Sequence, residues 1–208
     1  GIEYLNPNFL DMLIKYCRDM KYFDKVAFYS RLTCEFFPDS WHGYVRLAKE
    51  MLRQCRFSEC REILDEGISK VGSDFMLMCT YCDLERASGN RSQSLMVSRY
   101  IKNKFPGNYQ GYVREIQDLI SLGDFNSPSL LRDQIPTGLI PHAEVRDCLG
   151  WLDAVLKSNT TAPVLKNIWL NILSSPEFNE NIYNKIDSFR GDASMYKDVY
   201  PFQYWSQG

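Results

Sequence analysis

Cysteines form the first pattern in this chain that could do chemistry. Cys79 and Cys82 are separated by two residues, the spacing of half a structural zinc site or of a redox pair. A structural zinc site needs four ligands, and the only other close pair, Cys55 and Cys60, has a spacing unusual for zinc. A free cysteine behaves as a small hydrophobe. We therefore favour a packing role for these thiols over metal binding or redox chemistry, and we predict no metal and no cofactor.

The two histidines are the second candidate group. Neither His42 nor His142 has a serine or cysteine nucleophile at the spacing of a known motif. The sequence also lacks a glycine-rich phosphate loop, a G-x-S-x-G elbow, an H-E-x-x-H zinc motif and a D-x-D pair. We assign no catalytic residue. An enzyme with its site in the C-terminal third remains the alternative, and it requires acidic or histidine side chains that converge between residues 142 and 205.

Composition and charge exclude further classes. The chain has 208 residues, of which 45% are apolar, and its 24 basic and 26 acidic residues give a net charge of −2. Evenly spread charge offers no basic face for nucleic acid, and no apolar run of about 18 residues predicts a transmembrane helix. Seven scattered cysteines favour reduced thiols and a cytoplasmic location. The first residues lack both an initiator Met and a signal-peptide pattern, so we expect a piece of a longer chain or a processed product.

An internal repeat predicts the elements that position these residues. Residues 37–46 read FPDSWHGYVR, and residues 105–114, 68 positions later, read FPGNYQGYVR. That distance is twice 34, the period of a stacked helical hairpin. We therefore divide the chain into four 34-residue windows that open at Pro7, Trp41, Phe75 and Tyr109. Position 15, where a turn between two helices is expected, holds Lys21, Cys55, Gly89 and Gly123. Position 32, where a helix should end, holds Pro38, Gly72 and Pro106.

The second window shows the hairpin pattern most clearly. Its first half carries one helical face at Tyr44, Leu47, Ala48 and Met51, and its second half carries another at Phe57, Cys60, Leu64 and Gly67. Small side chains fall where two helices would cross closely, at Ala48, Cys60 and Gly67. The spacing predicts an antiparallel helix pair.

At these positions the sequence resembles the tetratricopeptide repeat family. The family pattern has an early aromatic residue, small residues at positions 8 and 20, an aromatic near 17 and a proline at 32. The second window carries it at Tyr44, Ala48, Phe57 and Cys60. The third window departs from it at Arg91, and the fourth breaks at Pro128, which leaves at best a half or capping hairpin. The resemblance covers residues 5–131 and implies an all-α, right-handed superhelix of three to four hairpins.

The resemblance also implies a concave groove that binds a protein or peptide, lined by positions 2, 5, 9, 12 and 13 of each first helix. The groove residues assigned in this way are Lys15, Arg18, His42, Val45, Lys49, Arg53, Met76, Asp83, Arg86, Gln110, Val113 and Gln117. Two interpretations stay open. Charged side chains on a helix face are typical of a solvated surface, whereas the basic cluster would suit an acidic or carboxylate-bearing segment.

The C-terminal third departs from the repeat. Residues 127–141 hold three prolines and predict a loop. Three helix patterns follow, at 142–156, 163–173 and 178–189, and we expect the region 139–190 to cap the end of the stack. Residues 191–208 predict an aromatic, non-helical tail or linker. Within it, residues 202–208 (FQYWSQG) resemble the opening strand of bacterial capsule and surface-polysaccharide glycosyltransferases; the alternative is an arm packed by its aromatics.

These observations favour a non-catalytic protein–protein interaction or oligomerisation module, with self-association included. The resemblance at the tail implies that the module regulates or scaffolds a larger bacterial polysaccharide glycosyltransferase. The alternatives are a stand-alone helical-repeat adaptor and the enzyme described above.

Overall fold

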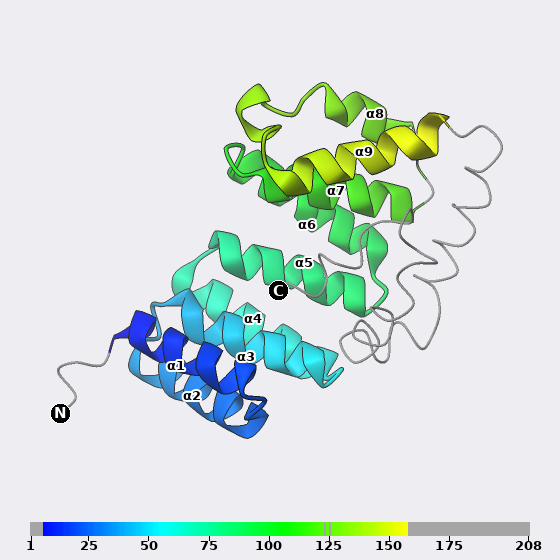
Figure 1. The fold of residues 1–208 in the computed structure, drawn as a ribbon. Coiled ribbons are helices and arrows are strands. Elements are labelled where there is room, and N and C mark those ends of the chain that lie inside the picture. The colour runs from blue at the N-terminus through cyan, green and yellow to red at the C-terminus, as the bar shows by residue number, and fades with distance from the viewer. Residues whose placement is uncertain (1–5, 123, 125, 158–208) are drawn as a thin grey trace. The chain divides into compact units, whose positions relative to one another are not determined.

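The regular structure of the described residues is helical throughout. The computed structural model describes residues 6–122, 124 and 126–157. The helices are α1 (Pro7–Asp19), α2 (Phe23–Phe36), α3 (Trp41–Arg53), α4 (Phe57–Val71), α5 (Phe75–Ala87), α6 (Arg91–Lys104), α7 (Tyr109–Ser121), α8 (Ser127–Arg132) and α9 (Ala143–Lys157), with a 3₁₀ turn at Thr137–Leu139 (Figure 1). The all-α prediction is confirmed for this part of the chain. The helices form two compact units that divide between Leu84 and Glu85, within α5.

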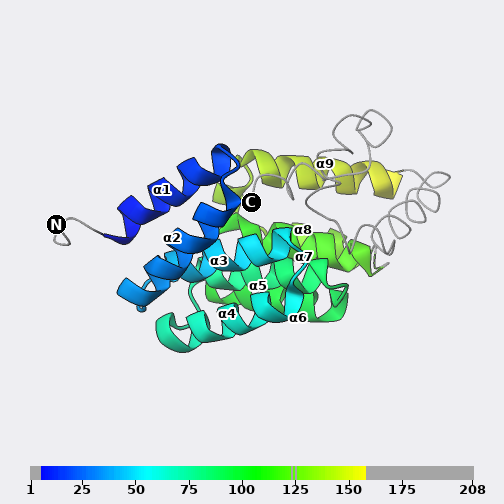
Figure 2. The same cartoon turned by 90° about the horizontal axis from the view of Figure 1, so that it is seen from below.

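The 34-residue period is confirmed by the helix boundaries. The four first helices, α1, α3, α5 and α7, begin at Pro7, Trp41, Phe75 and Tyr109, as the windows predict, and each has 13 residues. The second helices α2, α4 and α6 also begin 34 residues apart, at Phe23, Phe57 and Arg91. In the first unit α2 lies beside both α1 and α3, and α3 lies beside α4 (Figure 2).

The turn inside each hairpin has the same backbone conformation. Position 15 adopts a positive φ at Lys21 (60°), Cys55 (57°) and Gly89 (81°), the left-handed geometry that ends a helix. The N–H of the next residue then donates to the carbonyl of position 11, at 2.8, 2.9 and 2.8 Å in Tyr22–Cys17, Arg56–Met51 and Asn90–Glu85. Gly123, the fourth residue predicted at this position, lies outside the described residues. The turn forms although only one of the three residues is glycine, because the hydrogen bonds compensate the strain of a positive φ.

The repeated FP…GYVR segment is a backbone link between hairpins. Phe37 and Phe105 end their helices with nearly equal φ/ψ angles (−132°/62° and −126°/59°), and Ser40 and Asn108 start the next ones at −110°/128° and −110°/125°. The Ser40 N–H donates to Phe37 O at 3.0 Å, and the Asn108 N–H donates to Phe105 O at 2.9 Å. The sequence match therefore reflects one turn geometry used twice.

The glycine of each segment allows two helices to cross closely. A Cβ atom on Gly43 of α3 would lie 2.7 Å from the backbone nitrogen of Cys34 in α2, and one on Gly111 of α7 would lie 2.6 Å from the backbone of Lys102 in α6. A Cβ atom on Gly67 of α4 would similarly lie 2.9 Å from the Cβ of Tyr44. The crossings predicted at small residues are confirmed at Gly67. The core around it buries the predicted faces of the second window at Tyr44, Leu47, Ala48, Met51, Cys60 and Leu64, whereas Phe57 of the second face is half-buried.

Two short elements lie where the sequence predicted a loop. Residues 127–141 contain α8 and the 3₁₀ turn, so the loop prediction is wrong there. Pro128 occupies the first turn of α8, where a missing N–H needs no partner. Asp124 binds the start of the helix by accepting hydrogen bonds from the N–H groups of Asn126 (3.0 Å) and Ser127 (2.9 Å). Pro128 thus begins a helix instead of interrupting one.

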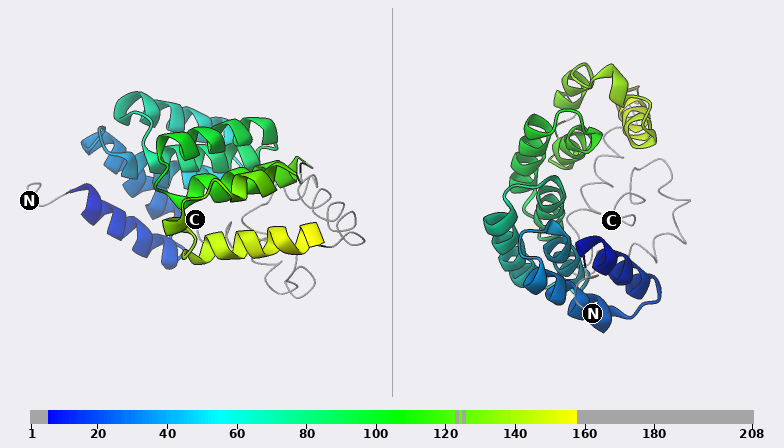
Figure 3. Two further views of the ribbon diagram at one scale, coloured as in Figure 1. Left: turned by 90° about the horizontal axis from the view of Figure 1, so that it is seen from above. Right: turned by 90° about the vertical axis from the view of Figure 1, so that its left-hand side faces the viewer.

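The helix predicted at residues 142–156 is confirmed as α9. It buries Val145, Cys148, Leu149 and Leu152, and within the second unit it lies beside α7 and α8 (Figure 3). The helix patterns at 163–173 and 178–189 and the tail at 191–208 lie outside the described residues.

Candidate partner-binding surface

The predicted groove residues of the first unit differ widely in exposure. The side chains of Lys15 and Arg18 on α1 are 49% and 42% exposed, and that of Arg53 on α3 is 30% exposed. Four more residues are half-buried: His42, Lys49, Met76 and Asp83. Val45 is fully buried, so its assignment to an open groove is corrected. Position 5 of the windows is a core position, since Asp11, Cys79 and Val113 are buried there as well.

Two of the cations at this surface, Lys15 and Arg53, are anchored by buried carboxylates. Asp11 on α1 binds Arg46 of α3 (Nε–Oδ1, 2.6 Å) and Lys15 (Nζ–Oδ2, 2.9 Å). Burial opposes the charge of Asp11, but the hydrogen bonds from Arg46 and Lys15 outweigh it and hold the pKa of this carboxyl below its ordinary value. The ion pair therefore joins α1 to α3 and fixes the position of Lys15.

Arg53 is held from two sides. Its Nε donates to both carboxylate oxygens of the buried Glu50, at 3.1 and 3.0 Å. Its guanidinium also lies 3.7 Å from the centre of the Phe23 ring, within the range of a cation–π contact. The exposed edge of Arg53 is thus preorganised, which lowers the entropy cost of binding a further carboxylate.

His42 has a packing role. Its ring stacks on Trp41 with centroids 3.8 Å apart, and its Nδ1 lies 2.8 Å from the hydroxyl oxygen of Ser40 at the start of α3. Burial lowers the pKa of His42 below its ordinary value, so the ring is neutral at pH 7.

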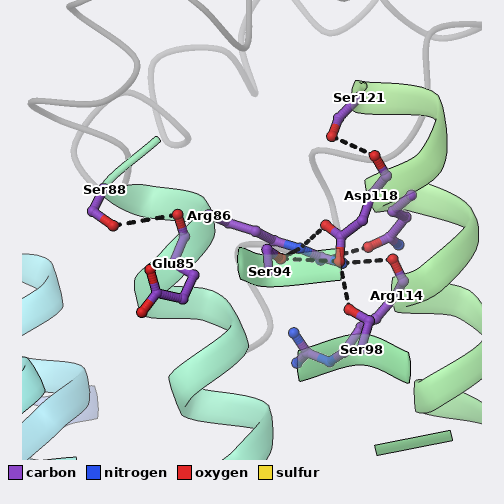
Figure 4. A network of polar contacts seen from close by, with 9 residues as sticks. Glu85, Arg86, Ser88, Ser94, Ser98, Arg114, Asp118 and Ser121 are labelled. Atoms are coloured by element: carbon purple, nitrogen blue, oxygen red, sulfur yellow. Dashed lines mark hydrogen bonds and ion pairs between the residues drawn. The ribbon is translucent and has the colours of Figure 1, made fainter. Parts of the chain in front are cut away.

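In the second unit most predicted groove residues are buried, which corrects their assignment. Arg86 donates from Nε to Asp118 (2.7 Å), from Nη1 to Gln117 (2.7 Å) and from Nη2 to the carbonyl of Arg114 (2.8 Å), as Figure 4 shows around Asp118. Asp118 also accepts hydrogen bonds from the hydroxyls of Ser94 (2.9 Å) and Ser98. A guanidinium tolerates burial only when its charge and donors are satisfied, and this network satisfies them.

The first-helix face of α7 is covered by the chain's own helix α9. The Tyr109 hydroxyl donates to Glu144 at 3.1 Å, and the Tyr109 ring stacks on His142 with centroids 4.7 Å apart. Val113 lies one turn further along the same face of α7 and is buried. Gln110, at the edge, stays half-buried. His142 and Glu144 therefore pack α9 against α7.

The cysteines act as small packing residues. Cys60 and Cys82 are fully buried at the positions where the repeat needs a small side chain, and the Cys60 thiol donates to the carbonyl of Ala48 at 3.3 Å. Burial raises the pKa of Cys34 and of Cys148 to about 12, so both thiols are protonated and unreactive at neutral pH. All seven cysteines lie in the described part of the chain and are present as thiols.

No family model, no curated protein and no solved structure matches the chain. None of the described helices is long and apolar enough to cross a bilayer. Within residues 6–122, 124 and 126–157, no three His, Cys, Asp or Glu side chains converge as a metal site would require.

One exposed feature was missed from the sequence. Phe9, Met12 and Tyr16 form an apolar stripe on α1 and are 48%, 64% and 59% exposed. The alignment of the windows contains a signal for this stripe. Positions 3 and 10 hold Gly43 and Glu50 in the second window, whereas they hold the large side chains of Phe9 and Tyr16 in the first.

The Asp11 ion pairs predict a pH dependence of stability. Because the folded-state pKa of Asp11 is depressed, its contribution to the free energy of unfolding is present above the unfolded-state value of about 3.9 and is lost as the pH falls through the folded value. Urea unfolding from pH 6 down to about pH 2 should show this loss, and the Asp11→Asn variant should show a flatter profile. An equally steep profile in the variant would show that Asp11 does not cause the loss of stability.

Proposed function

We propose that this chain is a non-catalytic protein-binding module whose first unit binds an acidic, amphipathic helix of a partner on the face of α1 and α3. One observation carries the proposal: three cations at groove positions of α1 and α3, Lys15, Arg18 and Arg53, are 49%, 42% and 30% exposed, and buried carboxylates hold two of them in place. First helices of this repeat also bind other helices side by side, since α3 lies beside α1 and α9 lies beside α7.

The charge of the surface selects the class of partner. Lys15 and Arg18 on α1 and the exposed edge of Arg53 on α3 present cations in a row of first-helix positions. Carboxylates on a partner segment would complement these cations. Complementary charges of this kind raise association rates and specificity more than affinity. An acidic helix with an apolar face therefore fits the surface better than a basic or extended segment.

The binding experiment uses the whole chain and a defined probe. A glutamate-rich amphipathic peptide of 15 residues, the length of α9, is titrated by fluorescence anisotropy. Because exposed ion pairs contribute about 0.2–1 kcal/mol each, neutralising Lys15 and Arg18 together (Lys15→Gln, Arg18→Gln) should weaken binding about three- to tenfold. The effect should shrink as salt is added.

The control variant neutralises two exposed cations on second helices, Arg31 of α2 and Lys70 of α4. It changes the net charge equally and should leave the affinity unchanged. Equal losses in both variants would show attraction by net charge alone, and binding of the glutamine version of the peptide with the same affinity would refute an acidic partner.

For the larger context, we extend the proposal to a cytoplasmic module that regulates or scaffolds a bacterial polysaccharide glycosyltransferase. The resemblance at residues 202–208 supports it, and those residues lie outside the described part of the chain. Co-sedimentation of this chain with a longer chain that continues past Gly208 tests it; a longer chain with full transferase activity after loss of residues 6–157 would refute it.

A further inference from the structure

The apolar stripe on α1 lies on a face that contacts the preceding helix in later windows of the repeat. In the later windows, position 3 is packed against the preceding second helix: Gly43 of α3 lies against Cys34 of α2, and Gly111 of α7 lies against Lys102 of α6. In the first window the same position holds Phe9, which is 48% exposed.

Position 10 shows the same contrast. Asp118 of α7 accepts hydrogen bonds from Ser94 and Ser98 of the preceding helix α6 and is buried. Its equivalent in α1 is Tyr16, which is 59% exposed, and Met12 lies between Phe9 and Tyr16 on the same helical face. The stripe therefore has the place of a helix–helix contact and the composition of an interface core, where Tyr, Phe and Met are enriched.

We propose that this stripe binds the α1 helix of a second copy of the chain, with the two helices antiparallel. The stripe is self-complementary in that orientation. When Met12 of one copy faces Tyr16 of the other, Phe9 lies one turn before the pair and Met20, also exposed, lies one turn after it. A two-fold symmetric dimer needs a patch that matches itself, and a net charge of −2 opposes its formation only weakly.

The size of the stripe sets the strength of the dimer. Large aromatic and similar side chains bury about 150–250 Å² each when covered completely. Four that are roughly half exposed supply on the order of 400 Å² per copy, below the roughly 800 Å² per partner of a standard interface. We therefore expect a reversible dimer with a dissociation constant in the micromolar range.

This inference is independent of the acidic-helix proposal. Viewed down the α1 axis, Lys15 lies roughly a third of a turn away from the centre of the stripe, and Arg18 lies roughly half a turn away. Neutralising both cations should leave the dimer unchanged, whereas loss of the stripe should leave Lys15 and Arg18 in place for a partner.

The test is sedimentation equilibrium of the full chain from about 1 to about 300 µM, a range that spans the affinity of a small interface. The parent chain should dimerise, and Met12→Lys should be monomeric over the range. Met96→Lys on α6 is the matched control, because Met96 is 63% exposed and Met12 is 64% exposed. Circular dichroism should show equal helix content in both variants.

A mixing experiment identifies the occupant as a second copy. Met12→Lys and Tyr16→Glu should each be monomeric alone, and an equimolar mixture should dimerise, because the two introduced side chains carry opposite charges and then face each other across the interface. A monomeric parent chain, a control variant as impaired as Met12→Lys, or a mixture that stays monomeric would each overturn the proposal.

Discussion

Replacement of Asp118 by alanine is expected to destabilise the second unit by about 3–5 kcal/mol. The substitution leaves the guanidinium of Arg86, 5% exposed, without its counter-charge, and it removes the acceptor of Ser94 and Ser98. An uncompensated buried charge costs more than the ion pair itself contributes. Urea unfolding followed by circular dichroism measures the change in the free energy of unfolding.

Two comparisons make this result specific. Asp133, exposed at the end of α8, provides the control, and Asp133→Ala should change stability by less than about 0.5 kcal/mol. The double variant Arg86→Met with Asp118→Leu should be less destabilised than Asp118→Ala, because it removes both charges and keeps most of the volume. A double variant at least as unstable as the single one would contradict the explanation by an uncompensated charge.

Replacement of Gly111 by alanine is expected to destabilise the chain by about 3 kcal/mol, although alanine is the better helix former by about 1 kcal/mol. The new methyl group would lie 2.6 Å from backbone atoms of Lys102, and a backbone in a neighbouring helix cannot rotate away as a side chain can. The helices α6 and α7 would have to separate, which would loosen the Asp118 contacts with Ser94 and Ser98.

Gly150 provides a control of opposite sign. It is an exposed glycine within α9, and a Cβ there would meet no atom within 4 Å. Gly150→Ala should therefore raise stability by about 0.5–1 kcal/mol. Thermal unfolding of the two variants decides the point, since stabilisation by both would mean that α6 and α7 do not cross closely at Gly111.

The sequence predicts the register of the repeat well because local residues determine it. The starts of the four first helices and the turns at Lys21, Cys55 and Gly89 depend on short-range hydrogen bonds, and a 34-residue alignment finds them. Pro128 was interpreted only as a helix breaker, although the deciding signal is also local. A proline can follow the end of one helix or occupy the first turn of the next. Pro128 occupies the first turn of α8, and the side chain of Asp124 accepts a hydrogen bond from the N–H at the start of that helix.

The candidate site is predicted less completely because burial depends on distant partners. Arg86 was assigned to an open groove, yet its carboxylate partner Asp118 is 32 residues away and follows no helical spacing. Val113 is buried at position 5, as Val45 and Cys79 are, and α9, which begins 34 residues after α7, lies beside α7. The family resemblance provides the positions of a groove, and it does not show which of them are buried in this chain.

The central claim is that the first-helix face of this repeat binds a helix and is accessible on α1 and α3. Its most direct test is an NMR titration of the labelled chain with the glutamate-rich peptide. The account predicts amide shift changes concentrated at α1 and α3, around Lys15, Arg18 and Lys49, with the second helices α2 and α4 unaffected. No shift changes at millimolar peptide, or changes confined to α2, α4 or α6, would contradict it.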